Sequence, residues 1–105
     1  MQRALAWAEL MGGNASKAKD LYEKLVKEEK ADKTDYLNAA HCCLSMGDLK
    51  NAIPLYKKFI EKSENPEIRS LVIAIRDDSE TLKRLKIKTE DLRLLVDKIR
   101  YDSEK

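Results

Sequence analysis

The feature that most constrains the fold of this chain is an internal repeat. A shift of 34 residues places one stretch of the sequence on another, with the apolar positions in phase. Seven residues are identical at this offset. The identical pairs are Ala6 and Ala40, Leu10 and Leu44, Gly13 and Gly47, Ala18 and Ala52, Leu21 and Leu55, Tyr22 and Tyr56, and Lys24 and Lys58. So many matches at one offset are hard to reach by chance, so we expect two copies of one structural unit.

Each copy has the pattern of two helices joined by a tight turn. In the second copy, apolar residues recur at helical spacing up to Gly47, which can adopt the left-handed conformation that ends a helix. Asp48 follows and is a good N-cap for the next helix. The first copy repeats the arrangement with Gly13 and Asn14. The sequence therefore predicts four helices over the two copies.

Two antiparallel helices repeated at a period near 34 residues resemble the tetratricopeptide repeat. The resemblance rests on small residues at the helix crossing, the turn glycine and the aromatic residue of the second helix. These are Ala6, Ala18, Gly13 and Tyr22 in the first copy, and Ala40, Ala52, Gly47 and Tyr56 in the second. The family's first-helix tryptophan has no counterpart here, and its proline is matched only by a displaced Pro66. Over residues 1–66 the resemblance implies an all-α, right-handed superhelix of antiparallel helix pairs, 1–32 and 33–66.

The repeat fades after Pro66, and residues 67–105 have the pattern of C-terminal capping helices. We expect Asn65 to cap the first of them, with Pro66 at its first position. An apolar face then continues as one long helix, or as two with a break near Asp77–Ser79. A further helix, capped by Thr89, carries one apolar side made of Leu92, Leu95, Val96 and Ile99. Terminal elements of solenoids are commonly atypical because one face must meet water.

In tetratricopeptide superhelices the first helices of the repeats line a concave groove that takes the ligand. The groove residues implied for this chain are Arg3, Trp7, Leu10, Met11, Leu37, Asn38, His41, Leu44 and Ser45. Leu71 and Ile75 would extend this groove if a third helix stacks in register. The surface is mostly apolar, so we expect it to bury a partner peptide or helix, with Trp7 as an anchor.

Some members of the family hold a partner's C-terminal carboxylate with lysine, asparagine and arginine side chains. Asn38 and Arg3 fit that pattern. Trp7, Ile68 and Val72 stand where further residues of such a clamp are expected. The sequence therefore does not support a carboxylate clamp.

The same apolar positions also have a purely structural explanation. Met1 falls inside the expected first helix, so we expect the chain to be a piece of a longer scaffold or adaptor. Trp7, Leu10 and Met11 would then pack on a further repeat or on a second copy. Leu37, Leu44 and Leu71 would be covered if the C-terminal helix folds back over them. An open groove and a filled one remain alternatives, because a large exposed apolar patch is a liability.

His41, Cys42 and Cys43 are adjacent and raise the question of a metal or redox site. Side chains of adjacent helical residues diverge by about 100°, whereas metal ligands must converge. The chain has no other cysteine or histidine to complete a ligand shell. We therefore expect packing cysteines, no metal and no cofactor.

Charge and composition exclude several classes of function. The 105 residues include 21 basic and 19 acidic side chains, a net charge of +2, which gives no general attraction to nucleic acid. No apolar run could span a bilayer, and the N-terminal stretch lacks the zones of a signal peptide. Phosphate-loop, nucleophile-elbow and zinc-protease motifs are absent from the sequence, so we expect that the protein is not an enzyme. Two adjacent cysteines make no disulfide framework, which favours a reducing compartment such as the cytoplasm.

Residues 81–99 favour a second interpretation, a DNA-binding helix-turn-helix. Their apolar spacing fits that motif, and five basic side chains could meet phosphates. These are Lys83, Arg84, Lys86, Lys88 and Arg93. Against it, Lys86 stands where the motif favours glycine, and Glu90 and Asp91 would repel the DNA backbone. A third interpretation is a structural cap that binds nothing itself.

Overall fold

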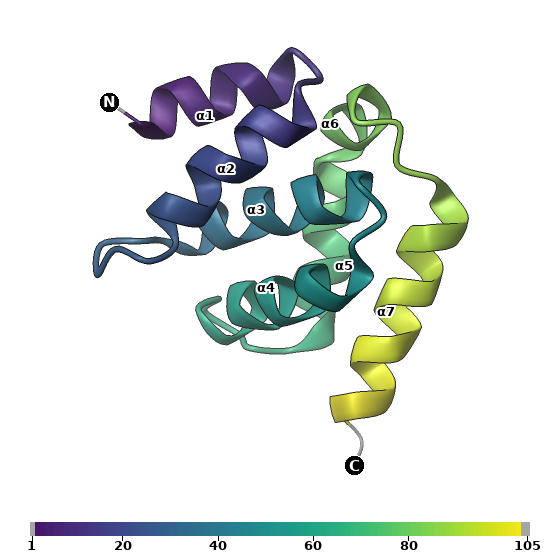
Figure 1. Ribbon diagram of the computed structural model, residues 1–105. Coiled ribbons are helices and arrows are strands. Elements are labelled where there is room, and N and C mark those ends of the chain that lie inside the picture. The colour runs from purple at the N-terminus through teal and green to yellow at the C-terminus, as the bar shows by residue number, and fades with distance from the viewer. Residues whose placement is uncertain (1, 104–105) are drawn as a thin grey trace.

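A computed structural model describes residues 2–103, and the regular secondary structure over that range is entirely α-helical. The expected all-α fold class is therefore confirmed. Figure 1 shows the first four helices as two successive hairpins, with α7 (yellow) running down one side of the molecule. The helices are α1 (Gln2–Met11), α2 (Ala15–Leu25), α3 (Lys33–Ser45), α4 (Leu49–Glu61), α5 (Ile68–Asp77), α6 (Ser79–Arg84) and α7 (Thr89–Ser103).

The turns after α1 and α3 have the same hydrogen bonds, as the repeat predicts. After α3, Gly47 lies at φ 75° and its N–H donates to the Leu44 carbonyl, while the Asp48 N–H donates to the Cys43 carbonyl. After α1, Gly13 lies at φ 80°, and the turn has the same two bonds one repeat earlier. This pair of bonds defines the Schellman motif, in which glycine is favoured because it has no Cβ. Both glycine turns are confirmed.

A third Schellman turn, between α6 and α7, contains a lysine in place of glycine. Lys86 lies at φ 60°, its N–H donates to the Lys83 carbonyl, and the Ile87 N–H donates to the Leu82 carbonyl. A side chain in this conformation costs about 1–2 kcal/mol relative to the right-handed region. The exposed turn therefore stores backbone strain.

We expect Lys86→Gly to stabilise the fold by about 0.5–1 kcal/mol, because relief of the strain exceeds the entropy that glycine adds to the unfolded chain. Urea denaturation followed by circular dichroism measures this change. Gly47→Ala, in the equivalent turn after α3, should do the opposite, although nothing lies within 4 Å of the added Cβ. An unchanged or lower stability of Lys86→Gly would show that the turn is not strained.

Three of the predicted N-terminal helix caps differ from those in the structure. Asp48 caps α4 through the Asn51 N–H, as expected, but Asn14 makes no side-chain cap for α2. The Asn14 side-chain N–H donates to Glu9 Oε2 at 2.9 Å, and its side-chain oxygen accepts no bond from the start of α2. The helix expected to start at Pro66 begins two residues later, after Glu67. Thr89 is the first residue of α7 rather than its cap.

The core consists of two clusters that share α3. One cluster joins α1, α2 and α3, and the other joins α3, α4, α5 and α7. Ala6, Ala18, Ala40 and Ala52, the small residues of the repeat, are all fully buried, so the helix pairs cross closely there. α7 packs against α4 and α5, whereas α6 contacts α1. The break at Asp78, one of the two alternatives predicted for this region, allows α6 to turn back toward α1.

Candidate functional site

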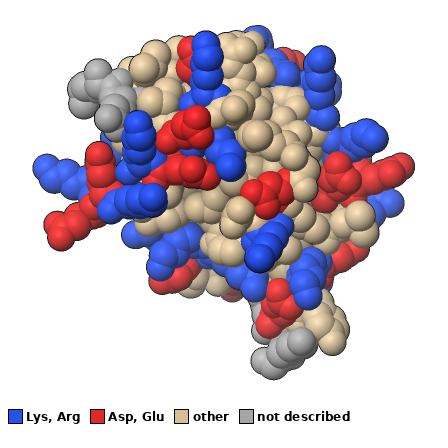
Figure 2. Space-filling model, viewed as in Figure 1, with Lys and Arg blue, Asp and Glu red and all other residues tan. Residues whose placement is uncertain are grey.

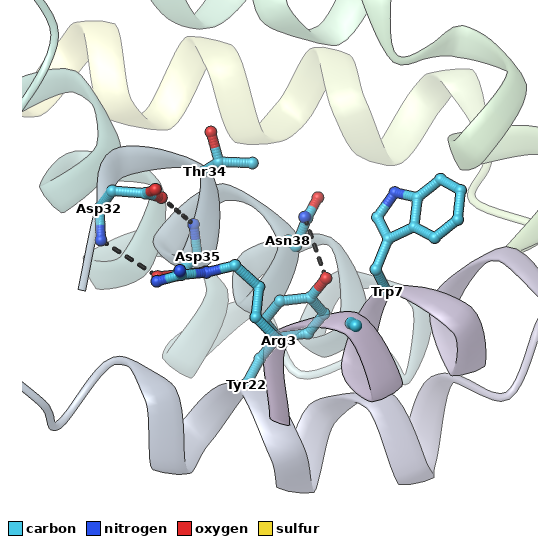
Figure 3. Close-up of a pocket in the computed structure, with 8 residues that line it drawn as sticks. Arg3, Trp7, Tyr22, Asp32, Thr34, Asp35 and Asn38 are labelled. Carbon is cyan, nitrogen blue, oxygen red and sulfur yellow. Dashed lines mark hydrogen bonds and ion pairs between the residues drawn. The ribbon is translucent and has the colours of Figure 1, made fainter. Parts of the chain in front are cut away.

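The candidate site is a pocket of about 530 Å³ between the N-terminal halves of α1 and α3 (Figure 3). α1 contributes one wall and α3 the opposite one, and the side chain of Tyr22 reaches the pocket from α2. The lining residues are Arg3, Ala4, Trp7, Tyr22, Asp32, Thr34, Asp35 and Asn38. Three of the nine predicted groove residues therefore lie together here: Arg3, Trp7 and Asn38.

Arg3 and Asp35 form a two-pronged ion pair across the pocket wall. Arg3 Nε donates to Asp35 Oδ1 at 2.8 Å, and Nη2 donates to Oδ2 at 2.6 Å. Burial alone would raise the pKa of Asp35. The bonds from Arg3 and from the Asp32 backbone outweigh burial, so the pKa of Asp35 lies below its ordinary value. The carboxylate is thus ionised and holds α1 against the start of α3.

Asp35 also forms the N-terminal cap of α3 together with Asp32. The Asp35 N–H donates to Asp32 Oδ1, and the Asp32 N–H donates to Asp35 Oδ2, both at 3.1 Å. This reciprocal pair is a capping box. Asp35 is not among the site residues predicted from the sequence, although two aspartates three residues apart before an apolar run are a recognisable signal of such a cap.

Tyr22 and Asn38 form the inner wall of the pocket. Tyr22 is buried, and its hydroxyl accepts a hydrogen bond of 3.2 Å from the Asn38 amide. Burial raises the pKa of Tyr22 to about 12, so the hydroxyl stays protonated at neutral pH. The inner wall is therefore neutral and already hydrogen-bonded.

Trp7 is the exposed aromatic residue of the pocket. Its side chain projects from α1 beside Asn38, on the side of the pocket away from Asp32 (Figure 3). The residue is 55% exposed, which is unusual for the largest apolar side chain in a protein. An indole held at the rim of an open pocket can stack on, or be covered by, a ligand.

The other six predicted groove residues are engaged by the protein itself. Leu10, Leu37, His41 and Leu44 are buried. The Ser45 hydroxyl donates to the Leu85 carbonyl at 2.7 Å. Met11 is partly buried, and its carbonyl accepts a bond from Arg84, the last residue of α6. Away from the pocket, the expected open groove is thus filled.

The C-terminal helices fill this part of the groove. Leu37 and Leu44 lie in one core cluster with Leu71 of α5 and with Leu95 and Ile99 of α7. Ile75 is partly buried against the same cluster. The C-terminal helices thus cover Leu37 and Leu44, whereas Trp7 stays exposed at the α1–α3 pocket.

His41 is fully buried and connects three helical elements. Its Nδ1 lies 2.6 Å from the Tyr56 hydroxyl of α4, and its Nε2 lies 3.0 Å from Asp78 Oδ2 at the bend between α5 and α6. A neutral imidazole satisfies both contacts when Nε2 donates to Asp78 and Nδ1 accepts from Tyr56. Here His41 is a structural cross-link rather than a groove-facing residue, because the bend at Asp78 covers it.

The two cysteines pack into different parts of the core. Cys42 belongs to the cluster of α1 and α2, and Cys43 to the cluster of α4, α5 and α7. Burial raises the pKa of Cys42 to about 12 and also raises that of Cys43. Both are free thiols that behave as small apolar side chains. In the part of the chain that the structure describes, no three His, Cys, Asp or Glu residues converge as metal ligands.

The segment that resembles a helix-turn-helix is packed into the fold. α6 has only six residues, and Leu82 and Leu85 are buried. The five basic side chains named above are exposed, but Glu80, Glu90 and Asp91 are exposed among them. Figure 2 shows positive and negative side chains interspersed over the face in view, with no large region of one sign.

Comparison of the chain with models of known protein families, with curated proteins and with solved structures found no match. Among the described helices, none is both long and apolar enough to cross a membrane.

Proposed function

We propose that this chain is a non-catalytic protein-interaction module that binds a peptide or a helix in the α1–α3 pocket. The observation that carries the proposal is the half-exposed Trp7 at the rim of a pocket whose polar walls are already fixed. A rigid pocket with an exposed aromatic anchor loses little entropy on binding, which favours recognition of a partner side chain.

The proposal includes a tetratricopeptide-like arrangement of the two helix pairs. The two helix pairs repeat at 34 residues, with the same glycine turns and with buried alanines at equivalent positions. α1 and α3, the first helices of the two pairs, line the pocket. That position corresponds to the ligand-binding side implied by the family resemblance.

The chemistry of the pocket favours binding over catalysis. Asp35 is tied to Arg3, and Asn38 is tied to Tyr22. The shifts of Asp35 and Tyr22 move their pKa values away from neutrality, so neither suits general acid–base catalysis at physiological pH. A partner would be held by contact with Trp7 and with the polar side chains at the edge of the pocket.

The test begins with a phage-displayed library of random twelve-residue peptides selected on the whole chain. Synthetic copies of the enriched peptides, chosen without tryptophan, are then titrated by fluorescence and by calorimetry. Trp7 is the single tryptophan of the chain, so its emission reports occupation of the pocket directly. We expect Trp7→Ala to weaken binding about 30-fold or more, the size of a typical aromatic hot spot.

Leu5→Ala is the matched control. Leu5 is also an exposed apolar residue of α1, at 53%, but it does not line the pocket. Its replacement should leave the affinity within about twofold, the range of near-neutral interface positions. Equal binding by the wild type and by Trp7→Ala, or failure to enrich any peptide, would contradict the proposed function.

A further inference from the structure

A second pocket lies on the other flank of α3. It has a volume of about 380 Å³ and is bounded by α3, α5 and the segment between α4 and α5. Lys33 and Leu37 line it from α3, whereas Thr34, Asp35 and Asn38 line the α1–α3 pocket. One helix therefore separates the two pockets, and a single extended ligand that crosses the N-terminal half of α3 can contact both.

Each pocket offers an exposed apolar residue. Trp7 is 55% exposed at the first pocket, and Ile73 of α5 is 40% exposed at the second. Val72, next to Ile73, is also exposed, at 42%. Val72 does not line the second pocket, so each pocket has one large exposed apolar side chain among its lining residues. The two pockets therefore provide separate apolar contacts for one ligand.

The charge of this surface opposes that of the whole chain. The chain has a net charge of +2, but the two pockets are lined by two basic and five acidic side chains. The basic ones are Arg3 and Lys33, and the acidic ones are Asp32, Asp35, Glu64, Asp77 and Asp78.

Several of these charges are already engaged. Arg3 is paired with Asp35, Asp32 caps α3, and Asp78 contacts His41. Glu64 and Asp77 are exposed, and within residues 2–103 neither makes an ion pair. Lys33 is likewise exposed and in no ion pair within that range, so two carboxylates and one ammonium of the second pocket are available to a ligand, and the carboxylates outnumber it.

We infer that the partner is a basic peptide, in which lysine or arginine side chains accompany apolar ones. This inference rests on the proposed function and assigns its partner class. The apolar side chains contact Trp7 and Ile73, and a basic side chain meets Glu64 and Asp77. Exposed ion pairs contribute specificity and association rate more than affinity, and salt weakens them. Nucleic acids and anionic lipid surfaces are negatively charged, as these carboxylates are, so this surface would repel them.

The experiment uses two capped nonapeptides that differ only in charge. One has three lysines on each side of a Leu-Gly-Leu centre, and the other has three glutamates on each side. Both are titrated against the whole chain at low and at physiological salt. The lysine peptide should shift Trp7 emission and bind at least tenfold more tightly, and the difference should shrink at the higher salt.

The double variant Glu64→Gln, Asp77→Asn tests the assignment of the charges. Both residues are exposed, so the variant should fold, and it should bind the lysine peptide about fivefold more weakly. Glu61→Gln together with Glu67→Gln, two exposed glutamates that do not line the pocket, should not change binding. Preference for the glutamate peptide, or failure of the lysine peptide to bind, would overturn the basic-peptide assignment. Selected peptides that require Trp7 would still uphold the proposed function in that case.

Discussion

Replacing His41 with leucine is expected to lower the free energy of unfolding by about 3 kcal/mol, the cost of leaving buried polar partners unsatisfied. The imidazole is fully buried and bridges the Tyr56 hydroxyl and Asp78. Leucine fills similar space but can accept or donate nothing. The Tyr56 hydroxyl then stays buried without its partner, and the α5–α6 bend loses its attachment to α3. Urea denaturation followed by circular dichroism measures the loss.

Tyr56→Phe provides the matched control for this prediction. It removes only the hydroxyl and leaves the contact between His41 and Asp78 intact, so we expect a smaller loss of about 1 kcal/mol. The double variant should lose less than the two single losses combined, because the two residues share one hydrogen bond. A loss below about 0.5 kcal/mol for His41→Leu would show that the network does not hold the helices together.

Asp35→Ala is expected to cost about 2 kcal/mol, because one carboxylate both caps α3 and pairs with Arg3. The variant loses the acceptor for the Asp32 N–H and frees α1 from the start of α3. Arg3→Ala is the control, since it removes the ion pair and keeps the cap. Because Arg3 is about half exposed, its replacement should cost clearly less. Equal losses in both variants would contradict the capping role.

The contribution of Asp35 also predicts a pH dependence. The pKa of Asp35 is lower in the folded chain than its ordinary value of 3.8 in the unfolded chain. The unfolded state therefore binds the proton more readily, and the carboxylate stabilises the fold above that value. This stability is lost as the pH falls through the folded pKa. The difference in unfolding free energy between the wild type and Asp35→Asn should thus shrink below pH 3.8 and stay constant above about pH 5.

Features that depend on a few neighbouring residues could be predicted from the sequence. Gly13 and Gly47 end their helices as expected, because a left-handed residue after an apolar helix is a local requirement. The same reasoning was wrong at Asn14, whose side chain makes no cap and instead donates to Glu9 Oε2. Lys86 adopts the left-handed conformation without being glycine, so its turn gave no compositional signal.

Features that depend on distant segments could be predicted only in part. The repeat register placed Arg3, Trp7 and Asn38 on facing helices, and the structure brings them into one pocket. The repeat register did not indicate that Asp78, 37 residues after His41, covers that histidine. Whether Leu37 and Leu44 are open or filled depends on the path of the C-terminal helices, and no local pattern specifies that path. The sequence accordingly left two alternatives there, and the structure shows Leu37 and Leu44 covered by the C-terminal helices.

Tryptophan fluorescence of the isolated chain tests whether the α1–α3 pocket is open to a ligand, because Trp7 is the single tryptophan and lines that pocket. Emission is recorded with an iodide quenching series over a range of protein concentrations. An open pocket predicts red-shifted emission that iodide quenches readily at every concentration, in keeping with the 55% exposure of the side chain. Blue-shifted emission protected from iodide would show that the protein itself, or a second copy at high concentration, fills the pocket, and would contradict the proposed binding site.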